Sequence, residues 1–152
     1  FSYIQEYGWS FELQVFASQM KDAARFASDF PETTMVLQHC GMPEDTSDVG
    51  VNLWREGMSR LAECQNVHCK FSGLGTFIHR NDPDFIADIT GECLKLFSAD
   101  RCLYGSNYPI EKIWTGYQSI VNAFQNAISG LSKAEQISVM RNNAMRIYKM
   151  DT

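Results

Sequence analysis

Apolar residues along this chain follow two different spacings. Four short segments are rich in aliphatic, β-branched or aromatic residues and stop at glycine, proline or a polar residue, as β-strands do. They cover 11–16, 33–38, 67–72 and 101–104. Between and after them, apolar residues recur every three or four positions, which is typical of helices with one buried face. The pattern predicts the order β-α-β-α-β-α-β-α-α.

The expected helices carry recognisable boundary signals. Asp82 offers a capping carboxylate, and Pro83 suits the first helical turn. Ser132 and Glu135 have the spacing of a capping box. The apolar faces lie in 18–30, 51–61, 85–96, 117–128 and 137–147. The last of these predicts an extra C-terminal helix beyond the four strand–helix pairs.

This alternation predicts an α/β protein whose strands run parallel and are joined by right-handed crossovers. Four such strands form either an open sheet or one half of a closed barrel. An open flavodoxin-like sheet is disfavoured, because no glycine-rich phosphate loop follows the first strand. No repeat or linker interrupts the chain, so residues 1–152 are expected to form one domain or part of one.

Composition indicates which partners and which cellular location to expect. The net charge is −5, and no basic stripe is present that could follow a phosphate backbone, so nucleic acid is not an expected partner. No apolar run approaches the roughly 20 residues that span a bilayer, so no membrane segment is expected. Five cysteines, an odd number without a CxxC pair, favour reduced thiols in a cytoplasmic protein.

Polar residues stand where the predicted strands end, which is where parallel β/α folds place their sites. Gln14 lies in the first strand, and 38–41 follows the second. The third strand carries 70–73, and 105–109 follows the fourth. We therefore expect candidate chemistry in these four stretches.

Five ordered motifs give the chain a family resemblance. They are Leu-Gln-Val at 13–15, Leu-Gln-His-Cys-Gly at 37–41, Lys-Phe-Ser-Gly-Leu at 70–74, Tyr-Gly-Ser-Asn-Tyr-Pro at 104–109 and Asn-Ala-Met-Arg-Ile-Tyr at 143–148. In this order they resemble the metal-dependent hydrolases of the second amidohydrolase family, in particular its sugar-lactonase and pyrone-dicarboxylate-lactonase branch.

The resemblance implies an eight-stranded (β/α)8 TIM barrel of which these four strands are the later half. It also implies an upstream half with a His-x-His metal motif, which these 152 residues lack. A divalent metal, zinc or manganese, is the implied cofactor.

His39 and Asn107 are the predicted catalytic residues. In the family, the histidine matching His39 binds the metal or polarises the substrate carbonyl, and a neutral imidazole suits either task. The alternative is a histidine whose hydrogen bonds are satisfied at a strand end. The family often has an aspartate where Asn107 stands, and an amide cannot accept the proton that a general base takes. Asn107 can still bind a substrate oxygen; the alternative is a turn-forming asparagine.

Lys70 and Gln14 are the predicted substrate-binding residues. A buried lysine needs a partner or a substrate anion, so Lys70 could hold a carboxylate or a lactone oxygen. Gln14 could equally be a polar residue that fills the barrel. His68 and His79 lie near Cys64 and Cys69, but the spacing lacks the second pair of a structural zinc site, so no zinc cluster is expected there.

Two functional hypotheses follow. The first is a hydrolase that opens a lactone or similar cyclic ester, incomplete in this chain. The second is a non-catalytic half barrel that associates with itself, because two open sheet edges and an uncovered inner face invite pairing with a second copy. A homo-oligomer, such as a dimer, is expected on this ground.

Overall fold

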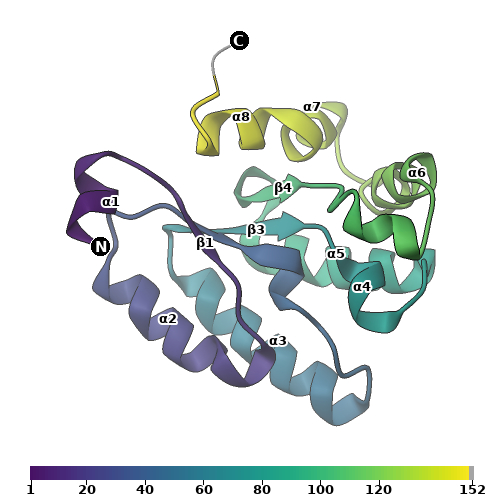
Figure 1. Ribbon diagram of the computed structural model, residues 1–152, viewed down its shortest axis with the longest axis horizontal. Helices are drawn as coiled ribbons and strands as arrows, with labels where there is room; N and C mark the ends of the chain where they lie inside the picture. The colour runs from purple at the N-terminus through teal and green to yellow at the C-terminus, as the bar shows by residue number, and fades with distance from the viewer. Residues whose placement is uncertain (151–152) are drawn as a thin grey trace.

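The computed structural model of the chain describes residues 1–150 and contains one parallel sheet (Figure 1). The strands β1 (Phe11–Leu13), β2 (Met35–Leu37), β3 (Val67–Phe71) and β4 (Cys102–Tyr104) pair in sequence order. All three pairings are parallel. The predicted α/β class, with four parallel strands and helices between them, is confirmed.

The helices begin and end close to the predicted signals. They are α1 (Ser2–Glu6), α2 (Met20–Asp29), α3 (Asp48–Glu63), α4 (Leu74–Ile78), α5 (Pro83–Phe97), α6 (Tyr117–Ala127), α7 (Lys133–Ile137) and α8 (Asn143–Ile147). The Asp82 carboxylate accepts a hydrogen bond from the Phe85 amide N–H at the start of α5. Ser132 and Glu135 form the capping box at the start of α7. The predicted C-terminal helix is continuous from α7 to α8, with a π-helical turn at Ser138–Asn142.

The main core lies between the sheet and the helices α2, α3 and α5, which cover one face (Figure 1). Alternate strand residues, such as Leu37, Cys69 and Phe71, point to this face and are fully buried. They meet Trp54 of α3 and Phe97 of α5, which are also buried. Burial of these apolar side chains against the sheet stabilises the half barrel.

The opposite face of the sheet is covered by the C-terminal helical segment (Figure 1). Ile147 of α8 packs with Val36 and Leu103 in a second, smaller cluster. The Asn143 amide donates to the carbonyls of Ala99 and Cys102, where β4 begins. The helix therefore lies near the start of β4 and leaves the carboxyl ends of the strands to the loops that follow them.

Two local features were not predicted. Each strand except β3 is only three residues long, because the chain turns away from the sheet sooner than the apolar pattern indicates. The short helix α4 directly after β3 was also missed, since five residues carry too little periodicity to signal a helix.

His68 on β3 makes the stability of the fold depend on pH. Burial, together with the positive charges of Arg146 and Arg101, lowers the pKa of His68 from 6.5 to about 4. Its Nδ1 atom has no hydrogen-bond partner among the described residues. Because the unfolded chain binds this proton more readily, stability is lost as the pH falls below 6.5. We expect this residue alone to lower the free energy of unfolding by about 2 kcal/mol between pH 7 and pH 5.

Urea unfolding at both pH values, with wild type and His68→Gln, measures this contribution. The pH dependence of the variant should be weaker by that amount. His79→Gln, a change at an exposed histidine, is the control and should keep the wild-type dependence. Equal pH dependence in wild type and His68→Gln would contradict the prediction.

Candidate functional site

His39 lies at the carboxyl end of β2, where one of its ring nitrogens is hydrogen-bonded and the other is open to solvent. Its Nδ1 atom lies 2.9 Å from the hydroxyl oxygen of Ser72, a buried residue directly after β3. The Nε2 atom makes no hydrogen bond to any residue of 1–150 and is open to solvent. The ring is thus oriented by the neighbouring strand, as a reactive or ligating histidine requires.

The backbone that presents His39 is strained. His39, Cys40, Gly41 and Met42 have φ values of 55°, 52°, 70° and 51° in succession. For residues other than glycine, this left-handed region costs roughly 1–2 kcal/mol each. Such strain persists only where the surroundings enforce it, and it gathers at functional sites.

Two neighbours enforce the turn. The indole nitrogen of Trp54 donates to the Cys40 carbonyl at 2.8 Å and holds the middle of the turn against α3. On the other side, Gly73 allows the imidazole to approach, because a Cβ atom at that position would collide with Nδ1 of His39. The orientation of His39 therefore depends on α3 and on the end of β3.

The ring of His39 is neutral at pH 7. Burial is the largest influence and lowers the pKa of His39 from its ordinary value of 6.5. Cys40 and Glu111 act in the opposite direction, while the charge of Lys70 lowers the pKa as burial does. A neutral imidazole keeps one N–H donor and one lone pair, which permits either metal binding or carbonyl polarisation.

Asn107 follows β4 in a left-handed conformation with φ of 54°. Its Nδ2 atom donates to Oε1 of Glu111 at 3.4 Å. The Oδ1 atom has no hydrogen-bond partner in the described part of the chain and is open to solvent. The strand ends thus present His39 Nε2 and Asn107 Oδ1, and we call these two groups the rim.

Glu111 is a polar residue of this region that the sequence did not reveal. It lies in the 3-10 turn Ile110–Ile113 and is fully buried. A single acidic residue in a loop gives no periodic or motif signal. Only its spacing of four residues from Asn107 could have drawn attention to it.

The two predicted substrate-binding residues, Lys70 and Gln14, differ in solvent exposure and in their protein contacts. The ammonium group of Lys70 lies 3.2 Å from the Tyr148 hydroxyl and 3.6 Å from a Glu12 carboxylate oxygen, and Tyr148 also donates to Glu12 at 2.7 Å. Lys70 therefore has protein partners and would have to exchange them for a substrate anion. Gln14 lies just past β1 and is exposed. Substrate binding by either residue stays a prediction.

Three cysteines come together behind the rim. The sulfur atoms of Cys40, Cys69 and Cys93 all lie within 4.8 Å of one another, and all three residues are fully buried on the helix side of the sheet. Cys40 donates weakly to the Lys70 carbonyl at 3.7 Å. Surrounded by apolar core residues, these thiols act as small hydrophobic side chains that support the strained turn from behind.

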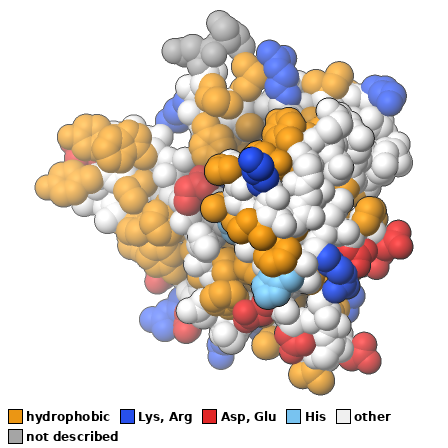
Figure 2. All heavy atoms as spheres, turned by 45° about the vertical axis from the view of Figure 1, so that its right-hand side comes forward, with side chains coloured by type: hydrophobic (Ala, Val, Ile, Leu, Met, Phe, Trp, Pro, Cys, Tyr) orange, Lys and Arg blue, Asp and Glu red, His pale blue; other side chains and the backbone are white. Residues whose placement is uncertain are grey.

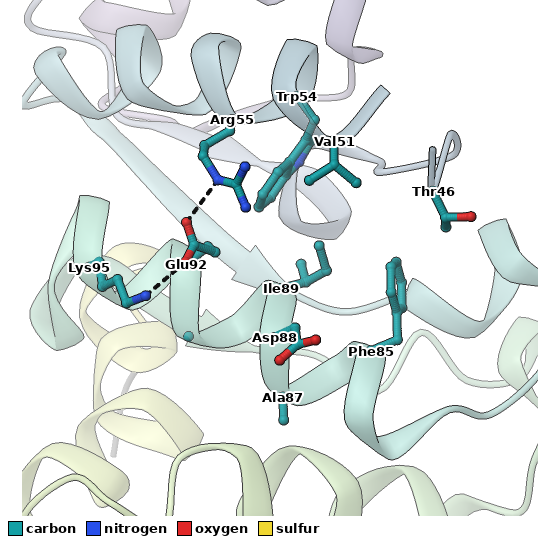
Figure 3. A pocket seen from close by; sticks show the side chains of 11 residues that line it. Thr46, Val51, Trp54, Arg55, Phe85, Ala87, Asp88, Ile89, Glu92 and Lys95 are labelled. Carbon is teal, nitrogen blue, oxygen red and sulfur yellow. Dashed lines mark hydrogen bonds and ion pairs between the residues drawn. The ribbon is translucent and has the colours of Figure 1, made fainter. Parts of the chain in front are cut away.

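A surface hollow of about 520 Å³ lies elsewhere, between the outer helices α3 and α5 (Figure 3). Trp54 and Phe85 line it, and Glu92 binds both Arg55 and Lys95 across one side. No residue of the rim lines this hollow. It is a groove between neighbouring helices of the outer layer. Trp54, which lines it, also donates a hydrogen bond to the Cys40 carbonyl in the turn that carries His39.

The donor atoms at the rim do not by themselves fit a catalytic metal. A catalytic zinc takes about three protein ligands, whereas the described residues of the rim offer one imidazole nitrogen and one amide oxygen. The Glu111 carboxylate is buried, and its Oε1 atom is occupied by Thr76 and Asn107. Zinc or manganese binding stays a prediction that requires further ligands.

The comparisons with known proteins agree with this geometry. The sequence matches the amidohydrolase family over residues 1–150, so the chain belongs to that family. It is 34% identical to the uncharacterized protein y4mH of Sinorhizobium fredii over 94% of this chain and 48% of that protein. It is 26% identical to an L-fucono-1,5-lactonase of Burkholderia multivorans, over 98% of this chain and 54% of that protein.

A solved structure of an amidohydrolase from Burkholderia multivorans with bound zinc superimposes with a TM-score of 0.92 at 24% identity. The match covers 98% of this chain and 55% of the other, which supports the predicted half barrel. The chain thus spans about half the length of the relatives it matches. No helix among residues 1–150 is long and apolar enough to cross a membrane.

Gly73 allows a direct test of how the histidine is held. Its φ of +66° and its contact with the His39 ring make Gly73→Ala unfavourable on two grounds. We expect a loss of about 2 kcal/mol in unfolding free energy, together with displaced ring resonances of His39 in NMR spectra.

Gly91→Ala is the matched control. Gly91 lies within α5, and an added Cβ atom would meet nothing within 4 Å. This substitution should stabilise the chain by about 0.5–1 kcal/mol and leave the His39 resonances in place. Unchanged stability and unchanged His39 resonances in Gly73→Ala would show that the glycine does not set the position of the ring.

Proposed function

We propose that the complete barrel to which this chain contributes is a hydrolase that opens a lactone or similar cyclic ester. The observation that carries the proposal is that the free Nε2 atom of a neutral His39 and the free Oδ1 atom of Asn107 are presented at the carboxyl ends of β2 and β4, on either side of β3. Membership of the amidohydrolase family and the likeness to an L-fucono-1,5-lactonase support it.

In this proposal His39 polarises the carbonyl of the substrate. The contact between Nδ1 of His39 and the Ser72 hydroxyl fits either tautomer of the ring, and we propose the one in which the hydroxyl donates to Nδ1. That hydrogen bond leaves the proton of the neutral ring on Nε2, where it faces solvent. An Nε2–H donor at this position binds the carbonyl oxygen and stabilises the negative charge that develops there as water attacks.

Asn107 has the complementary role of an acceptor. Its amide N–H group is directed to Glu111, so Oδ1 is the atom left to bind the attacking water or a substrate hydroxyl. Water adds to the carbonyl carbon, the ring C–O bond breaks, and one proton of the water passes to the departing ring oxygen. The product is a single hydroxy acid, whose carboxyl group releases the other proton to solvent at pH 7. Lys70 would bind the new carboxylate if its contacts with Tyr148 and Glu12 open. If a divalent metal is bound instead, Nε2 of His39 would have to carry a lone pair and Nδ1 the proton, and the other ligands would come from outside the described residues. The metal would then supply the Lewis-acid chemistry.

A second proposal is self-association of the half barrel. The strands β1 and β4 each pair on one side only, so the sheet has two open edges within the described residues. Beside β1, the side chains of Tyr3, Tyr7 and Trp9 are 60–70% exposed. Figure 2 shows hydrophobic side chains gathered at the protruding end of the molecule on the side of α1. A second copy that pairs with these edges would cover both features.

We also propose that the protein is located in the cytoplasm. All five cysteines are free, although four of them are buried close together in one core. Free thiols of this kind are typical of a reducing compartment.

The lactonase proposal is tested by acid release from L-fucono-1,5-lactone and related sugar lactones. The chain is assayed alone and mixed with the separately expressed N-terminal half of the Burkholderia multivorans lactonase, with added zinc or manganese. In an active mixture, His39→Ala should lower kcat/KM by about 100-fold or more, because the donor to the carbonyl is lost. His79→Ala is the control and should change little. Full activity in His39→Ala would contradict the proposed role.

Self-association is tested by size-exclusion chromatography with light scattering at tens of micromolar protein. We expect a mass of about twice 17.3 kDa. Trp9→Lys places a charge beside the open edge of β1 and should shift the population toward the monomer. Ile137→Lys, at an exposed residue of α7, should leave the mass unchanged. A folded wild-type monomer at this concentration would rule the proposal out.

A further inference from the structure

Glu111 is the only carboxylate that is buried within residues 1–150, and its burial needs an explanation. A buried charge is costly unless hydrogen bonds compensate it. All three hydrogen bonds that Glu111 accepts through its side chain end on Oε1. They come from the Thr76 amide at 3.2 Å, the Thr76 hydroxyl at 2.7 Å and the Asn107 amide at 3.4 Å.

The second oxygen of this carboxylate is left without compensation. Oε2 is buried and has no hydrogen-bond partner in the described part of the chain. It faces Gly75, where an added Cβ atom would lie 2.5 Å from Oε2. The fold thus leaves room for a carboxylate that it satisfies only on one side. Such an arrangement is a poor source of stability, so another role is indicated.

The position of Glu111 joins the loops that follow β3 and β4. Thr76 belongs to α4, two residues after Leu74, and Asn107 stands directly after β4. The acceptor on Glu111 also decides which way the amide of Asn107 is turned. With Nδ2 bound to the carboxylate, Oδ1 is the atom that faces solvent at the rim.

We infer that Glu111 is a positioning residue that holds the Asn107 amide with Oδ1 toward the rim and makes an amide, rather than a carboxylate, the suitable group at position 107. An aspartate there would put a second, partly exposed carboxylate within hydrogen-bonding distance of the buried Glu111 carboxylate, and like charges this close repel each other. The part of this inference that concerns catalysis rests on the proposed lactonase function; the placement of the amide does not.

The first test is the side-chain amide resonance of Asn107 in 15N-resolved NMR spectra of the whole chain. Glu111→Gln should shift this resonance and accelerate its exchange with water, because the charged acceptor is lost. Thr76→Val removes a different hydrogen bond to the same oxygen and should leave the Asn107 resonance near its wild-type position. Glu32→Gln, at an exposed acid, is the control for loss of charge. An unmoved Asn107 resonance in Glu111→Gln would overturn the inference.

The second test does not require Glu111→Gln alone to fold well. Asn107→Asp should lower the midpoint of urea unfolding at pH 7, and adding Glu111→Gln to it should restore much of the loss. Equal urea midpoints for wild type and Asn107→Asp would overturn the inference. It would also be overturned if the effects of Asn107→Asp and Glu111→Gln on stability were additive in the double variant.

Activity separates the inference from the function on which its catalytic part rests. If the assembled barrel opens lactones, Glu111→Gln should lower kcat more than it raises KM, because the bound water is misplaced in the transition state. If the amide resonance moves but no lactone is opened by the wild-type assembly, the proposed function fails and the placement of Asn107 stands.

Discussion

Where the chain leaves β2, four consecutive residues are kept at positive φ by contacts from three other parts of the molecule. The indole of Trp54 holds the Cys40 carbonyl, Gly73 gives the His39 ring its space, and the buried thiols of Cys69 and Cys93 lie behind the turn. None of these contacts is made within the turn itself. The direction of the imidazole is therefore a property of the packed core, and changes in that core would reach the rim through the turn.

The two rim atoms belong to neutral groups, although charged side chains lie in the same region of the fold. Glu111 is buried, and His39 is uncharged because its ring is partly buried. The partly exposed Lys70 and Glu12 are paired with each other, so the imidazole and the amide are the accessible polar groups that carry no charge. Such a pair suits a polar, uncharged group such as a carbonyl better than a strongly charged one. It also represents one side of a barrel mouth, in agreement with a chain that spans about half of its relatives.

The sequence predicted the order of elements well, because the apolar periodicity and the helix caps are local signals. Asp82 and Ser132 begin their helices as expected, and His39 and Asn107 could be located because strand ends share one edge. The details beyond that could not be predicted. The turn at His39 depends on a distant indole, and Glu111 is recognisable only once α4 is seen against it.

The partner of Lys70 also could not be predicted from the sequence. The sequence predicts a lysine that needs a partner, but that partner lies 78 positions away at Tyr148, in a segment whose motif gives no indication of which strand it meets. A substrate anion and the observed contacts with Tyr148 and Glu12 would each compensate the cost of partly burying the ammonium group. Only the position of the C-terminal segment across the sheet shows that Lys70 has protein partners.

That arrangement joins the two ends of the chain. Tyr148 donates to Glu12 across 136 positions of sequence, and Lys149 donates to the Gly8 carbonyl across 141. The region around β1 consequently acquires some of its contacts only after residues 148 and 149 have been synthesised. Contacts of such long sequence separation form late, because a large loop must close first. During synthesis β1 would lack these contacts until the segment after α8 has folded against it.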